Sequence, residues 1–168
     1  GVVKVDDRAF VVSDLPGLIE GASEGKGLGD RFLKHIERCG LLMHVLDLSH
    51  GLQEGGTVDT AVLVQEYETI RNELKAYSPT LAEKHEVIVL NKIDLVEDAS
   101  AVVSALKKEG IEIFATLSAA TKQGTDELMR KLLPIVLEER AKRDASLDEP
   151  SAELPVLRPH LEDDRMGA

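Results

Sequence analysis

The sequence has 168 residues, a formal net charge of −11, and 43% hydrophobic but only 3% aromatic side chains. This acidity argues against a basic RNA-binding stripe and against sequence-specific DNA recognition. A single cysteine, Cys39, excludes an internal disulfide and fits a reducing, cytoplasmic compartment. The apolar runs are short, so the sequence predicts neither a signal peptide nor a membrane span.

The first predicted elements are two short strands, over residues 2–5 and 9–13, which a polar turn joins into a hairpin. A glycine-rich loop follows and leads into a predicted helix over 30–38. The apolar run at 41–46 is typical of a strand buried on both faces. A long helical pattern comes next and ends at Ser78-Pro79; its apolar face carries Leu63, Tyr67, Ile70, Leu74 and Tyr77.

The second half of the chain alternates strands and helices. Residues 87–90 predict a fully buried strand, followed by a helix over 99–108 and a strand over 111–117. A final helix is predicted over 125–143, despite Pro134. Because such alternation is typical of parallel sheets covered by helices, we expect an α/β fold whose ligands bind beyond the carboxyl ends of the strands.

The most specific motif is Asn91-Lys92-Ile93-Asp94, directly after the strand at 87–90. The Asp94 carboxylate can accept hydrogen bonds from the ring N–H and the exocyclic amino group of guanine, a donor pair that adenine lacks. Asn91 can bind the base and tie neighbouring loops together, and the aliphatic stem of Lys92 can lie across the base. The alternative is a polar turn whose aspartate caps the next helix.

Two further strand ends carry related signals. Ser118-Ala119-Ala120 follows the strand at 111–117, and such small residues let a backbone N–H approach the guanine carbonyl oxygen. Alone, this is equally an ordinary small-residue loop.

Asp14-Leu15-Pro16-Gly17 follows the strand at 9–13. Asp14 can hold Mg²⁺ through water, and the Gly17 N–H can sense a terminal phosphate; an ordinary hairpin exit is the alternative. The three motifs occur in the order found in GTPases, which favours binding of GTP or GDP.

The phosphate-binding loop, G-x-x-x-x-G-K-[ST], has no good match. The nearest candidate, residues 21–27, has its first glycine one residue too close and Gly27 where a hydroxyl is needed. It also follows Asp14 instead of preceding it. We therefore predict that the loop is absent, and we expect the chain, which opens at Gly1 directly into a strand, to be an internal piece of a longer protein.

The sequence resembles the Obg family of bacterial translation-linked GTPases. The diagnostic segments are residues 10–22 (FVVSDLPGLIEGA) and 27–38 (GLGDRFLKHIER). The resemblance implies a parent protein that hydrolyses GTP as a Mg²⁺-dependent switch in assembly of the large ribosomal subunit. It also implies that Asp14, Leu15, Pro16 and Gly17 face Mg²⁺ and the terminal phosphate, that Asn91, Lys92, Ile93 and Asp94 read guanine, and that Ser118, Ala119 and Ala120 support it.

Leu18 stands where many GTPases place a glutamine that orients the attacking water. Leucine cannot donate or accept a hydrogen bond, so no catalytic residue is assigned. The Obg family is similar in having an apolar residue here, which implies slow intrinsic hydrolysis in the parent.

The resemblance implies that residues 1–143 are a partial G domain and that 144–168 are a linker or the start of a C-terminal domain. The fold would be a three-layer α/β sheet of the P-loop GTPase type, without its central first strand. The absent strand would lie between the strands at 9–13 and 41–46. Without it, these two strands must either close up and pair with one another or leave a slit with unpaired backbone groups. The fragment alone would be marginally stable and inactive; the competing interpretation is a nucleotide-independent interaction module or a non-functional truncated G domain.

Overall fold

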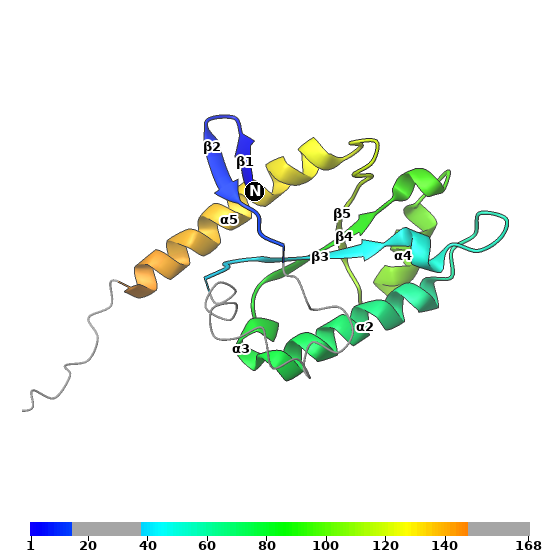
Figure 1. The fold of residues 1–168 in the computed structure, drawn as a ribbon, viewed down its shortest axis with the longest axis horizontal. Coiled ribbons are helices and arrows are strands. Elements are labelled where there is room, and N and C mark those ends of the chain that lie inside the picture. The colour runs from blue at the N-terminus through cyan, green and yellow to red at the C-terminus, as the bar shows by residue number, and fades with distance from the viewer. Residues whose placement is uncertain (15–37, 148–168) are drawn as a thin grey trace, which may run out of the picture.

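The structure is a computed structural model that describes residues 1–14 and 38–147 (Figure 1). Most of the predicted helix over 30–38, and the glycine-rich loop before it, lie outside the described residues. No helix in the described ranges is long and apolar enough to cross a membrane.

An antiparallel hairpin opens the chain, as predicted. It joins β1 (Val2–Val5) to β2 (Arg8–Val11), with Val5 opposite Arg8. Val5 and Phe10 are buried and pack in a cluster with residues of the long helix α5 (Thr125–Leu147). The hairpin is therefore held against a helix by its apolar side chains.

The predicted parallel sheet is confirmed. It contains β3 (Leu42–Asp47), β4 (Glu86–Asn91) and β5 (Ile113–Thr116) in the order β3-β4-β5. The four residues from Val87 to Leu90 are all buried, because β4 lies between two strands and has helices on both faces.

The side chains of β4 alternate between two apolar clusters, which gives three layers. Ile88 and Leu90 pack with residues of α2 (Thr60–Tyr77) and α4 (Ser100–Lys108). Val87 and Val89 pack on the opposite face with α5 and the hairpin. Figure 1 shows α2 and α5 on opposite sides of the sheet.

The helix ends follow local signals. The Asp59 carboxylate accepts a hydrogen bond from the Ala61 N–H at 3.0 Å and caps α2, and Ser78 ends α2 and caps the short helix α3 (Pro79–Ala82). Gly110, at φ +83°, follows α4 as predicted. Helix α5 runs to Leu147, beyond the predicted end at 143, although Pro134 lies within it.

The expectation that the run at 41–46 is buried on both faces is wrong for one face. Leu42, His44 and Leu46 are buried, but Val45 on the opposite face is 44% exposed. Among the described strands, β3 pairs only with β4, so it forms an edge and this face is incompletely covered.

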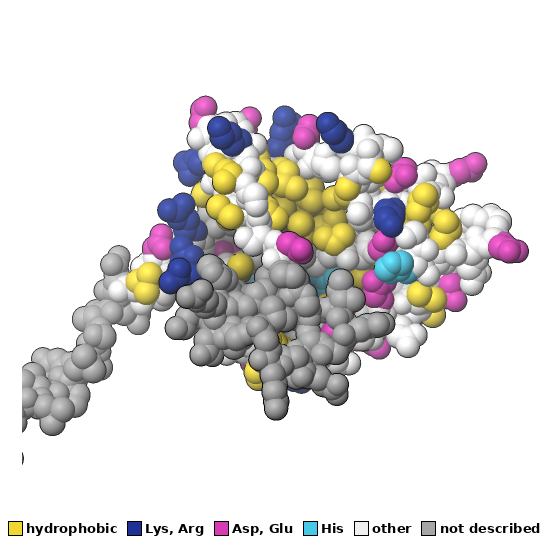
Figure 2. Space-filling view, viewed as in Figure 1, with side chains coloured by type: hydrophobic (Ala, Val, Ile, Leu, Met, Phe, Trp, Pro, Cys, Tyr) yellow, Lys and Arg dark blue, Asp and Glu magenta, His cyan; other side chains and the backbone are white. Residues whose placement is uncertain are grey.

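β2 and β3 do not pair with one another in the described part of the chain. These two strands belong to separate sheets and share no ladder. Figure 2 shows hydrophobic side chains gathered on the surface between the hairpin and the parallel sheet. Val11 of β2 is 70% exposed. Of the two alternatives expected from the sequence, direct pairing of the two strands is not observed, but Phe10 of β2 and Met43 of β3 pack in the same apolar cluster.

Candidate functional site

The candidate site lies where the parallel strands end. Asp47 at the end of β3 is in register with Asn91 at the end of β4, and Leu90 is in register with Thr116 near the end of β5. The segments that follow the three strands therefore start at one edge of the sheet, the edge at which α/β proteins bind ligands.

The segments after β4 and β5 are joined by two hydrogen bonds. The Asn91 Oδ1 atom accepts from the Ala119 N–H at 3.1 Å, and the Ile93 N–H donates to the Leu117 carbonyl at 3.2 Å. The sequence predicted that Asn91 ties neighbouring loops, and the structure confirms it. The tie places Asn91-Lys92-Ile93-Asp94 beside Ser118-Ala119-Ala120.

Lys92 has an unusual backbone conformation. Its φ of 66° and ψ of 35° lie in the left-handed region, which non-glycine residues rarely adopt and which is enriched at functional sites. Asp94 follows in the short 3₁₀ helix η3 (Ile93–Leu95) and is exposed. No side chain in the described ranges forms an ion pair with Asp94, so its carboxylate is accessible to a ligand.

Asp47 binds Lys92 across the ends of two strands. The Lys92 Nζ atom lies 2.7 Å from Asp47 Oδ2, and Asp47 Oδ1 accepts from the Ser49 N–H at 2.9 Å and the Ser49 hydroxyl at 2.5 Å. Burial raises the pKa of Asp47, but the hydrogen bonds from Lys92 and Ser49 outweigh it, so the pKa lies below its usual value. The carboxylate therefore stays charged near neutral pH.

Sequence reasoning missed Asp47 and Ser49. Asp47 directly follows the apolar residues of a predicted strand, so the rule that singled out the three motifs also applied to this strand end.

Ser118 cannot contact a ligand directly, because it is fully buried. Its N–H donates to the Gln123 carbonyl at 2.9 Å, and its hydroxyl accepts from the Thr121 N–H at 3.2 Å. It thus shapes the loop that presents the exposed residues Ala119 and Ala120.

Gly124 closes the same loop against β5. Its φ is +76°, and a Cβ atom there would lie 2.5 Å from the Thr116 carbonyl oxygen. Only glycine allows both this conformation and this approach.

Of the residues predicted to face the phosphates, the structure describes only Asp14. Asp14 is exposed and follows β2, and in the described part of the chain no hydrogen bond or ion pair joins it to residues 91–94. Leu15, Pro16, Gly17 and Leu18 lie outside the described residues. Within the described ranges, no three His, Cys, Asp or Glu side chains are grouped so that they could hold a metal ion.

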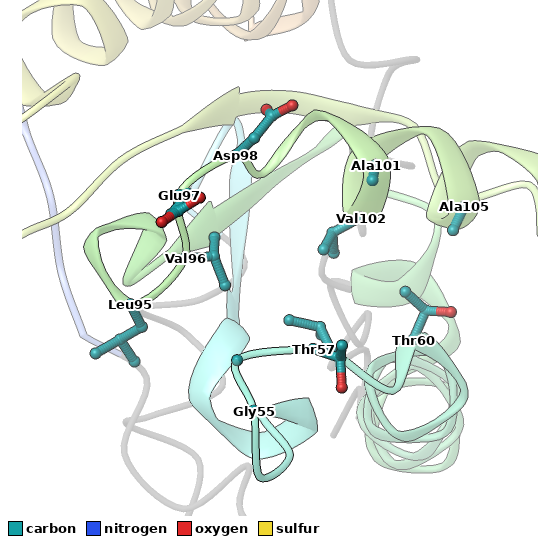
Figure 3. Close-up of a pocket in the computed structure, with 12 residues that line it drawn as sticks. Gly55, Thr57, Thr60, Leu95, Val96, Glu97, Asp98, Ala101, Val102 and Ala105 are labelled. Atoms are coloured by element: carbon teal, nitrogen blue, oxygen red, sulfur yellow. The ribbon is translucent and has the colours of Figure 1, made fainter.

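A groove of about 690 Å³ lies beside residues 91–94 (Figure 3). It starts at Leu95, one residue after Asp94, and is closed by the loop of Gly55 and by α4. Val96 and Val102 line it. It includes none of residues 91–94, so it is a neighbour of the candidate site and not part of it.

A parallel α/β sheet with these motifs at its strand ends is the arrangement of a partial G domain of the P-loop GTPase class. Residues 1–92 match the model of the family described as "50S ribosome-binding GTPase". Over 143 residues, or 83% of the chain, the sequence is 45% identical to GTPase Obg of Thermosipho africanus, of which it covers 31%. The chain belongs to the Obg family of GTPases, and it spans about a third of the length of this relative.

Proposed function

We propose that this chain is the guanine-recognising part of an Obg-type G domain. Its parent would bind GTP and GDP and hydrolyse GTP as a switch in assembly of the large ribosomal subunit in the cytoplasm. The observation that carries the proposal is the 3.1 Å hydrogen bond from Ala119 to Asn91, which joins the guanine motif at the end of β4 to the small-residue loop after β5.

Base selection in this proposal depends on Asp94. Its exposed carboxylate accepts the ring N–H and the exocyclic amino group of guanine. An adenine base would leave the charge without these donors, which is the kind of mismatch that proteins reject strongly. Lys92 supplies an apolar stem for the face of the base, and Ala120 offers a backbone N–H group for its carbonyl oxygen, since the Ala119 N–H already donates to Asn91.

The phosphate end would depend on Asp14 and Gly17, with a phosphate-binding loop that the parent supplies. Asp14 is a single exposed carboxylate, so it would hold Mg²⁺ only through water and together with nucleotide phosphates. Among the described strands, the second edge of β3 is unpaired and Val45 is exposed, which supports a further strand beside β3, because such a strand would pair with the edge and its side chains would flank Val45.

Hydrolysis in the parent would be slow without the ribosome, since Leu18 cannot orient water by a hydrogen bond. The family match to ribosome-binding GTPases supports the large subunit as the partner. A fast rate of GTP hydrolysis without ribosomes would contradict this part of the proposal.

The test is a calorimetric titration of the intact gene product with GDP and with ATP. We expect GDP to bind, ATP to bind far more weakly, and Asp94→Ala to abolish the preference. Glu97→Ala is the matched control, because it removes one exposed carboxylate three residues further along. Indifference to both nucleotides would refute the proposal and favour a nucleotide-independent interaction module.

A further inference from the structure

Asp47 uses both of its carboxylate oxygens at the edge of the guanine site. Oδ2 lies 2.7 Å from the Lys92 ammonium, and Oδ1 accepts two hydrogen bonds from Ser49. The Lys92 ammonium also donates to the Ser49 hydroxyl at 3.2 Å. Asp47, Ser49 and Lys92 thus form a closed triangle of contacts between the ends of β3 and β4.

This triangle restricts a side chain that is otherwise very flexible. Lysine carries a compact charge on a four-carbon stem with many rotamers, which it loses when it is ordered by a ligand. The left-handed backbone of Lys92 fixes the start of the stem, and Asp47 fixes its end. The side chain is still 46% exposed, so the stem remains accessible.

We propose that Asp47, with Ser49, is a positioning residue for nucleotide binding, holding Lys92 so that its aliphatic stem forms a preorganised wall for the purine. This inference rests on the proposed guanine site. It assigns Asp47 no part in choosing between bases, because the stem can pack on the face of any purine. Choice of base is left to Asp94.

The competing explanation is that Asp47 only starts the 3₁₀ helix η2 (Leu48–Gly51), where it is the N-cap. Asp47→Asn separates the two roles. Asparagine keeps a side-chain oxygen that can accept from the Ser49 N–H, as asparagine does at helix starts, but it removes the charge that attracts Lys92.

His50 also faces the same carboxylate. Its Nε2 atom lies 3.6 Å from Asp47 Oδ2, and its Nδ1 atom lies 2.9 Å from Glu66. Every variant below keeps His50, so this contact is common to all the proteins compared.

The experiment measures dissociation constants of GDP and inosine diphosphate, which lacks the exocyclic amino group, on the intact gene product. We expect Asp47→Asn to weaken both roughly three- to tenfold, the range for one partly exposed charge-assisted contact. The ratio of the two constants should not change. In Asp94→Ala, by contrast, the ratio should fall toward one.

A double-mutant cycle identifies the route of the effect. In a Lys92→Met background, which keeps an unbranched apolar stem but no ammonium, Asp47→Asn should change neither constant. Asp59→Asn is the matched control: Asp59 caps α2 without touching Lys92, and its substitution should not alter binding. Ser49→Ala leaves Asp47 in place and should weaken binding by a smaller factor.

An Asp47→Asn protein that binds both nucleotides as the wild type does would overturn the inference, as would an equal loss in the Lys92→Met background. If Asp47→Asn does not fold, unchanged binding by Ser49→Ala would overturn it instead. A wild-type protein that binds neither nucleotide would refute the proposed function, and this inference with it. If the wild type binds the nucleotides and the variants bind them equally well, only this inference is refuted and the proposed function stands.

Discussion

Gly124 offers a direct test of how the loop after β5 is held. Its φ of +76° lies in the left-handed region, and a Cβ atom would come 2.5 Å from the Thr116 carbonyl oxygen and 3.3 Å from Leu117 Cα. Both neighbours belong to the backbone, so neither can move without displacing the end of β5. We therefore expect Gly124→Ala to destabilise the protein by more than backbone strain alone.

The magnitude is the sum of two costs. A left-handed alanine costs about 1–2 kcal/mol, and overpacking against a fixed neighbour costs about 1–3 kcal/mol. The expected loss of unfolding free energy is thus about 3 kcal/mol. Gly110→Ala is the matched control, because Gly110 has a similar φ of +83° but no atom within 4 Å of the place that a Cβ atom would take. It should lose only about 1 kcal/mol.

The assay is urea unfolding followed by far-ultraviolet circular dichroism, with GDP titration of the folded variants. Gly124→Ala should be the less stable variant and should also bind GDP more weakly, since the loop presents Ala119 and Ala120. Equal destabilisation by the two alanines would refute the close-approach argument.

Four further outcomes are expected. The side chain of Leu63 in α2 is fully buried, so Leu63→Ala should lower the free energy of unfolding by about 2–5 kcal/mol. Val62 beside it is more exposed, and Val62→Ala should lower it by under about 1 kcal/mol in the same urea assay. Similar losses in the two variants would contradict this packing. Glu86→Gln should cost about 1–3 kcal/mol, because the carboxylate lies 3.1 Å from His44 and 3.4 Å from Arg71; an unchanged melting temperature would oppose this. Burial raises the pKa of Glu86, but His44 and Arg71 outweigh burial, so this pKa lies below its ordinary value of 4.5. The stability that the Glu86 carboxylate contributes is therefore complete above pH 4.5 and is lost as the pH falls through the folded-state pKa. A melting temperature that falls just as steeply with pH in Glu86→Gln would argue against this account. The isolated chain should unfold broadly at low temperature because β3 has one unpaired edge among the described strands, and a cooperative, high-melting transition would disprove that expectation.

Local patterns predicted most of the elements. The apolar run at 87–90 identifies a strand that is buried on two faces. The helical spacing of apolar residues from Leu63 to Tyr77 identifies a helix that is buried on one face. Both patterns are complete within a short stretch of sequence, so both could be recognised without the structure. Gly110 likewise marks the end of α4. The predicted end of α5 at 143 is too early, because residues 144–147 continue the helix without a buried apolar face that would signal it.

Features that depend on distant partners were harder to predict. Val45 looks like a core residue in the sequence, and its exposure follows from what lies beside β3. The contact of Asp47 with Lys92 joins residues far apart in the sequence and exists only because β3 and β4 end in register. The burial of Ser118 likewise depends on a loop that folds back through Gln123 and Gly124.

The central claim is that guanine is read at the ends of β4 and β5. The most direct measurement records backbone amide NMR signals of the intact protein during addition of GDP and, separately, ADP. GDP should shift the signals of Asn91, Lys92, Asp94, Ala119 and Ala120, and ADP should leave them in place. Equal shifts with both nucleotides, or GDP shifts confined to other elements, would contradict the claim.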